Sequence, residues 1–379
     1  MLQREDSVYV IFNLHSSTKN GKLELYITNA EEKIMLKDIV REGDSLNFNL
    51  PVFESSFKTK ILRDGSLQGT WIKGTAARIQ YWPFYAKSGE KERFGQKLGN
   101  AKANLSGRWR MMLTRPNGTT RMAIAEFEQK GNKLTGTVIT PNGDYRYMEG
   151  IVTGDSMFLS VFDGAHAYFF RAEINASSNL SGFFYAGIGG RESFAAVRDA
   201  NAKLPEGSST PQLREGESKL DFKFKDLDGN WVSIRDDRFK NKVVVVQIMG
   251  SWCPNCMDET AFLSDFYKNN KSRGVEIVSL AYEYGTDFER SLKTLKKFQQ
   301  LHKVTYPMLI TGVGVSDSLR TEKTLPQITP IKAFPTTIFI GKDGDVKRLH
   351  TGFAGPGAKE YYEEYKSKFY KTIDDLLKE

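Results

Sequence analysis

The stretch VVVVQIMGSWCPNC, Val243–Cys256, decides the fold of the C-terminal part of this 379-residue chain. Val243–Met249 is a continuous apolar run typical of a buried strand, and Met257–Asn269 carries apolar side chains at helical spacing. The turn between them holds both cysteines of the chain, Cys253 and Cys256. Because there is no third cysteine, any intramolecular disulfide must join these two.

Strand-like and helix-like patterns alternate through the rest of residues 220–379. The expected elements are a hairpin, a second buried strand, a second amphipathic helix, a closing hairpin and a final helix; they occupy Phe222–Lys225 with Trp231–Ile234, Val275–Ala281, Phe288–Leu301, Thr336–Ile340 with Val346–Thr351, and Tyr361–Leu377. Strands that alternate with helices in this way predict a mixed sheet with helices on both faces, an α/β domain.

Residues 1–200 have a different pattern, with short alternating runs separated by turn residues. Thr120–Phe127 and Lys133–Ile139, for example, flank a Gly-Asn pair. This is typical of antiparallel strands, and a weak internal repeat predicts two related meanders, about 7–86 and 105–199. We expect an all-β region in which the meanders pack together or close one barrel. Residues 201–219 are rich in Pro, Gly, Ser and Glu, which predicts a linker.

The charge balance excludes some classes of partner. The net charge is +8, from 54 basic and 46 acidic residues, without a long block of one sign. We therefore expect a solvated surface and no nucleic-acid partner.

No run approaches the ~18 apolar residues of a membrane-spanning helix, so we expect no membrane insertion. The first residues, MLQRED, also lack the pattern of a signal peptide, so we expect either a cytoplasmic chain or one from which a targeting segment has been removed.

The position of the cysteines predicts redox chemistry. Cys253 would lie at a helix N-terminus, where free N–H groups and the helix dipole favour an anion such as the attacking thiolate. Pro254 suits the first helical turn because it has no N–H to leave unpaired. Cys256 lies three residues later on the same helical face, so it is placed to resolve a mixed disulfide. We expect Cys253 to be the exposed nucleophile and Cys256 the more buried resolving thiol.

Two alternatives for the cysteine pair remain. Two cysteines three residues apart also form half of many zinc sites, but none of the four histidines shows metal-ligand spacing. They could also be structural thiols. We expect no metal, and no cofactor beyond the redox-active Cys253–Cys256 disulfide itself.

The combination of WCPNC at Trp252–Cys256 with FPTT at Phe334–Thr337 resembles the thioredoxin superfamily. The fit is closest to the TlpA/ResA-like branch of extracytoplasmic thiol–disulfide oxidoreductases, and it covers about 220–379. The long segment Tyr282–Pro335 matches an insertion typical of that branch. The resemblance implies a thioredoxin fold and exchange with protein thiols and disulfides, mostly as a reductant. It also implies a periplasmic or otherwise extracytoplasmic location and a membrane thiol reductase as electron donor.

The resemblance also assigns residues that bind the substrate. Pro335 would be the cis-proline that faces the disulfide, leaving the backbone of Phe334 free to pair with an extended substrate next to Thr336. An ordinary trans proline at the start of a strand is the alternative. Trp252 would shield the disulfide and line the substrate surface, or else pack in the core.

Proton transfer is the last role that the resemblance assigns. Glu259 matches the acid of the C-x-x-C-x-x-E pattern in ResA-like proteins and shares a helical face with Cys256, so it could exchange a proton with that thiol. The alternative is a solvated glutamate in the first turn of a helix. Asp258 points elsewhere and is less suited. Gln247 replaces the buried aspartate of thioredoxins, which shifts the proton-transfer task to Glu259 or leaves exchange slower.

Two other functions compete with this one. A peroxidase is disfavoured because no Pro-x-x-x-Thr/Ser-x-x-Cys loop precedes Cys253. The second is a binding protein whose β-rich region captures a ligand, with the thioredoxin-like domain as a scaffold. The Gly107–Trp109 strand start resembles, weakly, the G-x-W of lipocalin and avidin-like barrels. A ligand-sized cavity among Trp71 and Trp109 would favour this alternative.

Overall fold

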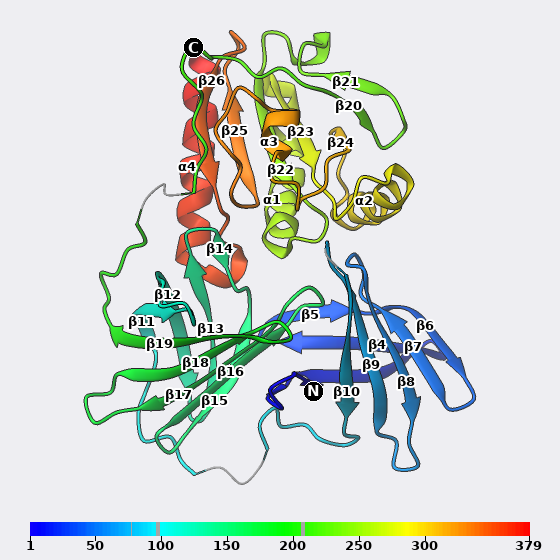
Figure 1. Ribbon diagram of the computed structural model, residues 1–379, viewed down its shortest axis with the longest axis vertical. Coiled ribbons are helices and arrows are strands. Elements are labelled where there is room, and N and C mark those ends of the chain that lie inside the picture. The colour runs from blue at the N-terminus through cyan, green and yellow to red at the C-terminus, as the bar shows by residue number, and fades with distance from the viewer. Residues whose placement is uncertain (77, 96–98, 206–208) are drawn as a thin grey trace. The chain divides into compact units, whose positions relative to one another are not determined.

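The computed structural model describes residues 1–76, 78–95, 99–205 and 209–379 (Figure 1). They form two compact units, one made of Met1–Gly74, Ile79–Thr140 and Asp144–Pro205, the other of Thr75–Arg78, Pro141–Gly143 and Glu206–Glu379. Three positions of the predicted linker, 206–208, lie outside the described residues. Among the residues that are described, no helix is long and apolar enough to cross a membrane.

The second unit is built on a seven-stranded sheet with the order β21-β20-β24-β23-β22-β25-β26. Its strands are β20 (Lys223–Asp226), β21 (Trp231–Ser233), β22 (Val243–Met249), β23 (Val275–Ala281), β24 (Met308–Ile310), β25 (Thr336–Ile340) and β26 (Val346–Thr351). Strands β22, β23 and β24 are parallel, whereas β25 and β26 form an antiparallel hairpin beside β22. This is the mixed sheet that the sequence predicts, with one further strand, β24.

Both faces of the central strand β22 are covered, which explains its unbroken apolar run. Val244, Val246 and Ile248 join a hydrophobic cluster with Leu325 and Ile331, which follow the short helix α3 (Arg320–Thr324). The opposite face is covered by longer helices. The helices are α1 (Pro254–Asn270), α2 (Phe288–His302) and α4 (Glu360–Lys378), with 3₁₀ turns at Asp237–Phe239, Lys271–Arg273 and Pro356–Ala358.

Aromatic side chains hold α4 against α1 and β25. The ring of Phe369 on α4 lies 5.0 Å from that of Phe262 and 4.9 Å from that of Phe266, both on α1. It also lies 5.3 Å from the ring of Phe339 on β25. Edge-on aromatic contacts stabilise a packed pair beyond the apolar area that they bury. They therefore hold the C-terminal helix α4 against α1 and β25.

The first unit contains a closed antiparallel barrel. Its sheet has the order β12-β11-β19-β18-β17-β16-β15-β13-β14, and an additional β12–β13 pairing closes eight of the strands. They are β11 (Gly107–Thr114), β12 (Thr120–Lys130), β13 (Lys133–Thr140), β15 (Met148–Thr153), β16 (Ser156–Phe162), β17 (Ala167–Ile174), β18 (Leu180–Ala186) and β19 (Gly190–Arg198), with β14 (Gly143–Asp144) outside the ring. Full closure removes the sheet edges.

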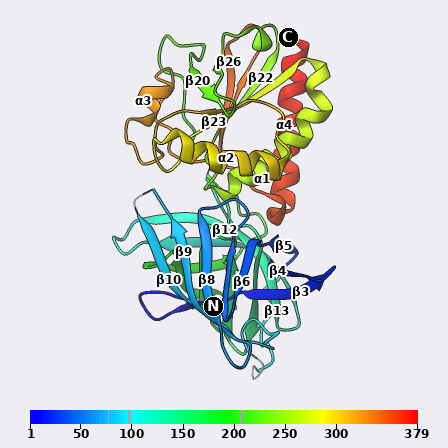
Figure 2. The same ribbon diagram turned by 90° about the vertical axis from the view of Figure 1, so that its right-hand side faces the viewer.

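The strands before the barrel form two separate sheets. One has the order β2-β1-β10-β9-β8-β7-β6, in which β8, β9 and β10 lie side by side (Figure 2), and the other has the order β3-β4-β5. Their bounds are β1 (Leu2–Gln3), β2 (Tyr9–Val10), β3 (Asn13–Lys19), β4 (Lys22–Asn29), β5 (Glu32–Met35), β6 (Lys37–Glu42), β7 (Ser45–Asn49), β8 (Ser55–Ile61), β9 (Leu67–Gly74) and β10 (Ile79–Ala86). The all-β, barrel-like prediction is confirmed, and the second meander closes the barrel by itself.

The two tryptophans of the binding hypothesis are core residues. Trp71 and Trp109 are fully buried in different hydrophobic clusters. The indole N–H of Trp71 donates to Ser55 Oγ at 2.7 Å, and that of Trp109 donates to the carbonyl of Leu105 at 2.9 Å. Each ring is therefore packed in a core and its N–H is hydrogen-bonded, so the two tryptophans do not line a ligand cavity.

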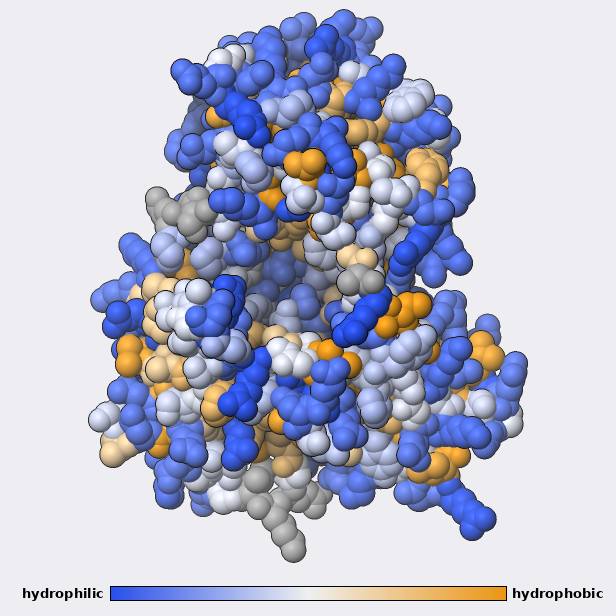
Figure 3. Space-filling view, viewed as in Figure 1, coloured by the Kyte–Doolittle hydropathy of each residue, from blue (hydrophilic) through white to orange (hydrophobic). Residues whose placement is uncertain are grey.

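Hydrophilic side chains cover most of the face of the molecule seen in Figure 3.

Candidate active site around the cysteine pair

The two cysteines are placed by the first turn of α1. Cys253 is the N-cap residue, with extended backbone angles (φ −102°, ψ 111°), and Pro254 begins the helix. The backbone N–H of Cys256 donates to Cys253 Sγ at 3.2 Å. This bond uses one of the N–H groups that a helix N-terminus leaves unpaired. The pair is present as two thiols.

The surroundings of the two thiols differ. Cys253 keeps 5% of its surface exposed, whereas Cys256 is fully buried. Burial, followed by the hydrogen bond with Cys253, raises the pKa of Cys256 well above its ordinary value, and the charge of Glu259 acts in the same direction. Cys256 is therefore held as a thiol until a base takes its proton. Cys256 is the deeper of the two, as expected, but Cys253 is also buried and is not the exposed nucleophile that the sequence predicts. The attacking role of Cys253 and the resolving role of Cys256 stay predictions.

The loop before β25 brings a proline to the cysteine pair. The Phe334–Pro335 peptide bond is cis, as the FPTT motif leads us to expect. The Cys253 thiol donates to the carbonyl of Phe334 at 3.7 Å. Thr336 is fully buried, and its hydroxyl bonds to the Ala333 carbonyl and to Thr351. Its predicted contact with a substrate is therefore limited to the backbone.

Trp252 covers the same loop from the side. Its indole N–H donates to the carbonyl of Tyr282 at 2.8 Å, and its ring lies 5.3 Å from that of Phe334 and 5.7 Å from that of Tyr284. The close approach requires Gly250, because a Cβ there would lie 2.2 Å from the indole nitrogen. The side chain is half-buried, so both of its predicted roles, packing and lining the surface, remain compatible with its position.

Glu259 lies inside the protein, which excludes the solvated alternative. It is fully buried, and three side chains donate to its carboxyl group. Gln247 Nε2 reaches Oε2 at 2.9 Å, while the hydroxyls of Thr337 and Tyr365 reach Oε1 at 2.5 and 2.9 Å. Burial raises the pKa of Glu259, and these hydrogen bonds oppose that rise. These hydrogen bonds therefore offset part of the cost of burying the charged form of the carboxyl group.

Gln247 has a fixed orientation in this network. Its Oε1 accepts from the hydroxyl of Ser279 at 2.8 Å and from that of Thr260 at 3.2 Å. Its Nε2 is therefore turned toward Glu259. An amide in this orientation donates to the carboxylate and cannot relay a proton. The acid–base role that thioredoxins give to an aspartate at this position is absent here, as the sequence indicates.

The sequence assigned no role to three residues of the site, although Thr337 lies in the FPTT motif. Tyr365 and Thr337 complete the donor set of Glu259 from α4 and β25. Glu283, which is 7% exposed, accepts from the N–H and the hydroxyl of Ser251 at 2.9 and 2.6 Å and so holds the turn before Cys253. Glu283 comes directly after the buried strand β23, and this position at a strand end is the feature of the sequence that could have marked it as a site residue. Nothing in the sequence around Tyr365 marks it.

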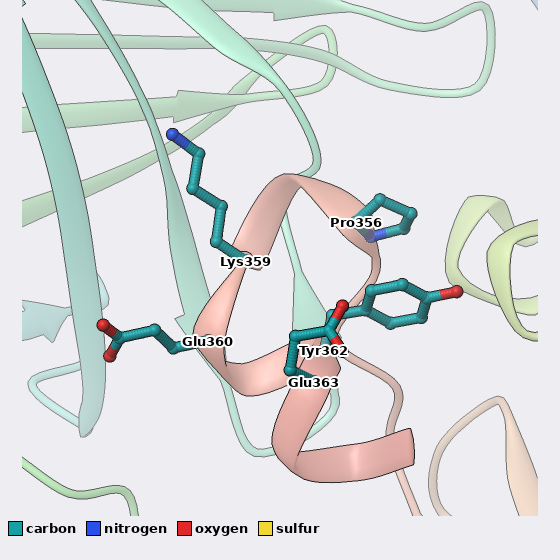
Figure 4. A pocket seen from close by; sticks show the side chains of 5 residues that line it. All are labelled: Pro356, Lys359, Glu360, Tyr362 and Glu363. Carbon is teal, nitrogen blue, oxygen red and sulfur yellow. The ribbon is translucent and has the colours of Figure 1, made fainter. Parts of the chain in front are cut away.

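A depression lies at the start of α4, lined by Pro356, Lys359, Glu360, Tyr362 and Glu363 (Figure 4). Gly355, just before this segment, lies against α1, because a Cβ on it would be 2.6 Å from Asp258 Oδ2. Among the described residues, no group of three or more His, Cys, Asp or Glu side chains is arranged to hold a metal ion.

Comparison with known proteins identifies relatives of this unit. Residues 205–365 match the Redoxin family. The thiol-disulfide oxidoreductase ResA of Geobacillus kaustophilus is 31% identical over 137 residues, which are 36% of this chain and 69% of that protein. ResA of Bacillus cereus is 28% identical over 161 residues, 42% of this chain and 82% of that protein. ResA of Bacillus subtilis is 26% identical over 140 residues, which are 37% of this chain and 69% of that protein.

The relatives agree with the site geometry. A dithiol at a helix N-terminus faces a cis-proline loop, and a buried carboxylate lies on the helical face of the second cysteine. Proteins of this kind exchange electrons between dithiols and disulfides. The chain belongs to the ResA-like thiol–disulfide oxidoreductases of the thioredoxin superfamily.

Proposed function

We propose that this protein reduces disulfides of other proteins with the Cys253–Cys256 dithiol, without a further cofactor. The observation that carries the proposal is the asymmetry of the pair. Cys253 keeps 5% of its surface exposed at a helix N-terminus beside the cis-proline loop, while Cys256 is fully buried on the helical face that carries Glu259. An attacking thiol at a helix N-terminus, backed by a more deeply buried resolving thiol, is the arrangement that disulfide exchange requires.

The reaction consists of two displacements. The Cys253 thiolate attacks one sulfur of the substrate disulfide, so a mixed disulfide forms and the other substrate sulfur leaves as a thiolate that takes a proton. Cys256 then gives its proton to Glu259 and attacks Cys253 Sγ, which releases the second substrate sulfur. Two electrons pass to the substrate, and the protein is left with a Cys253–Cys256 disulfide. A membrane thiol reductase then returns two electrons.

The substrate would lie along the cis-proline loop. The carbonyl of Phe334 faces Cys253, so an extended peptide can pair with the backbone at this position while its sulfur approaches the thiol. Trp252 and Pro335 would form the apolar sides of this surface. An extracytoplasmic location, and the reducing direction itself, rest on the resemblance to ResA-like proteins.

The experiment that tests this function is a measurement of the reduction potential of the full-length protein, by equilibration against a thiol buffer with mass readout. A value near or below ~−250 mV is expected for a reductant, whereas a value near ~−120 mV would make the pair an oxidant and contradict the proposed direction. If no reversible disulfide forms, the exchange mechanism is wrong.

Two variants test the roles of the cysteines. Cys253→Ser should lose all exchange with a disulfide substrate, because the attacking sulfur is gone. Cys256→Ser should instead accumulate a mixed disulfide on Cys253, visible as an added mass that a reductant removes. Turnover by the Cys253→Ser protein would overturn the assignment.

A further inference from the structure

Tyr365 connects the C-terminal helix to the carboxyl group beside the cysteines. Its hydroxyl, on α4, donates to Glu259 Oε1 at 2.9 Å across 106 residues of sequence. The ring is held from several sides, 4.7 Å from the ring of Phe353, 5.9 Å from that of Phe262 and 5.3 Å from that of His350. With its ring packed in this way, the phenol has little freedom to point elsewhere.

The donors around Glu259 differ in what they can do when the carboxyl group changes charge. Gln247 only donates, since its oxygen is already occupied by Ser279 and Thr260. The hydroxyls of Thr337 and Tyr365 can each donate or accept. A carboxylate can therefore accept three hydrogen bonds, and a carboxylic acid can donate from Oε1 to one of the two hydroxyls. The phenol is one of the two partners that serve both states.

We propose that Tyr365 is a positioning residue for disulfide exchange: its hydroxyl holds the Glu259 carboxyl group ready to take and return the proton of Cys256. This inference rests on the proposed function, in which Glu259 is the base. It means that α4, which carries no residue of the motif, contributes to the chemistry through this one hydroxyl group.

The groups that face Tyr365 come from three elements, and the charged or titratable ones lie on α1 and β26. Glu259 on α1 faces the phenol together with Thr337 on β25, while Arg348 and His350 lie on β26. Burial, and then the charge of Glu259, raise the pKa of Tyr365 well above its ordinary value. The phenol therefore keeps its proton through the whole pH range of an activity assay. Any pH dependence that it controls must arise in Glu259.

The test compares Tyr365→Phe with Tyr370→Phe in the full-length protein. Tyr370 lies on the same helix, is 41% exposed and contacts the ring of Phe266 at 5.3 Å, so it is a matched control. Cys253 is first converted to its mixed disulfide with glutathione. The rate at which Cys256 releases glutathione is then followed by mass spectrometry from pH 5 to pH 9.

Loss of the hydroxyl should move the pH profile and leave its plateau in place. A charged carboxylate that loses a donor is destabilised relative to the acid, so more of it stays protonated at a given pH. We expect the Tyr365→Phe profile to shift by about one pH unit toward higher pH, with a roughly tenfold slower release at pH 6. Tyr370→Phe should follow the original profile.

Two further proteins separate positioning from a structural effect. In a Glu259→Gln background, Tyr365→Phe should cause no additional change, because its partner no longer titrates. A 3,5-difluorotyrosine at position 365 keeps the ring and hydroxyl but is a stronger donor, so its profile should shift toward lower pH. This protein also tests the proposal if Tyr365→Phe fails to fold.

The outcomes distinguish this inference from the function on which it rests. If Glu259→Gln alters the profile and Tyr365→Phe does not, the role of Tyr365 is wrong and the exchange mechanism stands. An equal shift in the Glu259→Gln background would also overturn it, since the effect would not pass through Glu259. If Glu259→Gln leaves the profile unchanged, Glu259 is not the base and the role of Tyr365 is wrong, whereas disulfide reduction by the cysteine pair is still decided by the reduction potential and the cysteine variants.

Discussion

His350 should make this unit sensitive to mild acid. It lies on β26, directly opposite Thr337 on β25, and its ring packs 5.3 Å from that of Tyr365. Burial, and then the charge of Arg348, lower the pKa of His350 from 6.5 to about 4; Lys368 acts in the same direction, and a hydrogen bond with the backbone of Gly352 opposes them. The perturbation we consider is His350→Gln, which keeps a polar side chain and removes the titration.

The size and sign of the effect follow from the lowered pKa. Between pH 6.5 and about 4, the unfolded chain binds a proton at this histidine that the folded protein does not bind. Its contribution to stability is therefore complete above about pH 6.5 and is lost as the pH falls toward 4. At about 1.4 kcal/mol per pKa unit, this shift corresponds to about 3 kcal/mol of unfolding free energy.

The assay must report on this unit alone, because a chain with two compact units need not unfold in one step. Hydrogen exchange in a urea series, read by mass spectrometry on peptides from β22, β25 and β26, meets this need. Between pH 7.5 and pH 4 the original protein should lose about 3 kcal/mol more than His350→Gln in these peptides. Peptides from the barrel strands should respond equally in both proteins.

Parallel pH profiles of the two proteins in the sheet peptides would refute this reasoning. The histidine would then either be protonated in the folded protein or be exposed at little cost. A larger loss in the variant would show that the ring matters through packing against Tyr365 and not through its proton.

Three further predictions concern packing around the pair. Phe262→Ala should cost about 3–5 kcal/mol in the same urea series, because it removes a buried ring that packs against Phe369; a cost below 1 kcal/mol would mean that α1 and α4 repack freely. Gly250→Ala should slow disulfide exchange roughly tenfold or more by displacing Trp252, with the helix content unchanged in circular dichroism; normal exchange would show that the indole position is not needed. Gln247→Leu should cost about 1–3 kcal/mol by removing a donor to the buried carboxylate, and the cost should be larger at pH 8 than at pH 5; an equal cost at both would contradict an ionising partner.

The elements of the second unit were predictable where they are long and buried. The predicted bounds Val243–Met249, Val275–Ala281, Thr336–Ile340 and Val346–Thr351 are those of the observed strands. Strand β24 and helix α3 were missed because three and five residues are too few to show a period. Helix α1 begins at Pro254, before its first apolar repeat, because the cysteine turn forms its N-terminus.

The β-rich unit was predictable in type but not in pairing. Alternation marks a strand and its buried face, but it does not name the neighbouring strand. The alternating pattern of the two meanders therefore did not indicate that β12 pairs with β13 and closes a barrel within the second meander alone. For the same reason, the separate three-stranded sheet β3-β4-β5 was not expected.

The candidate site shows the same limit. Cys253, Cys256 and Glu259 could be found because they follow one another along a single helix, so their spacing in the sequence determines how close they lie in the structure. Tyr365 and Thr337 reach Glu259 across 106 and 78 residues of sequence, respectively. Only the folded sheet and the packing of α4 bring them to Glu259, so these contacts could not be read from a local motif, although Thr337 itself lies in the FPTT motif.

If Glu259 is the base that we propose, the packing of α4 and the acid–base chemistry of the pair are not independent. Gln247 cannot carry a proton, and the donors of the Glu259 carboxyl group come from β22, β25 and α4. A change that loosens α4, such as Phe262→Ala, should then move the pH profile of Cys256 toward higher pH as well as lower the stability, because it disturbs the Tyr365 hydrogen bond. The glutathione-release assay separates the two effects. If stability falls and the profile stays in place, the phenol keeps its contact without the aromatic packing, and the coupling between α4 and the cysteines is absent.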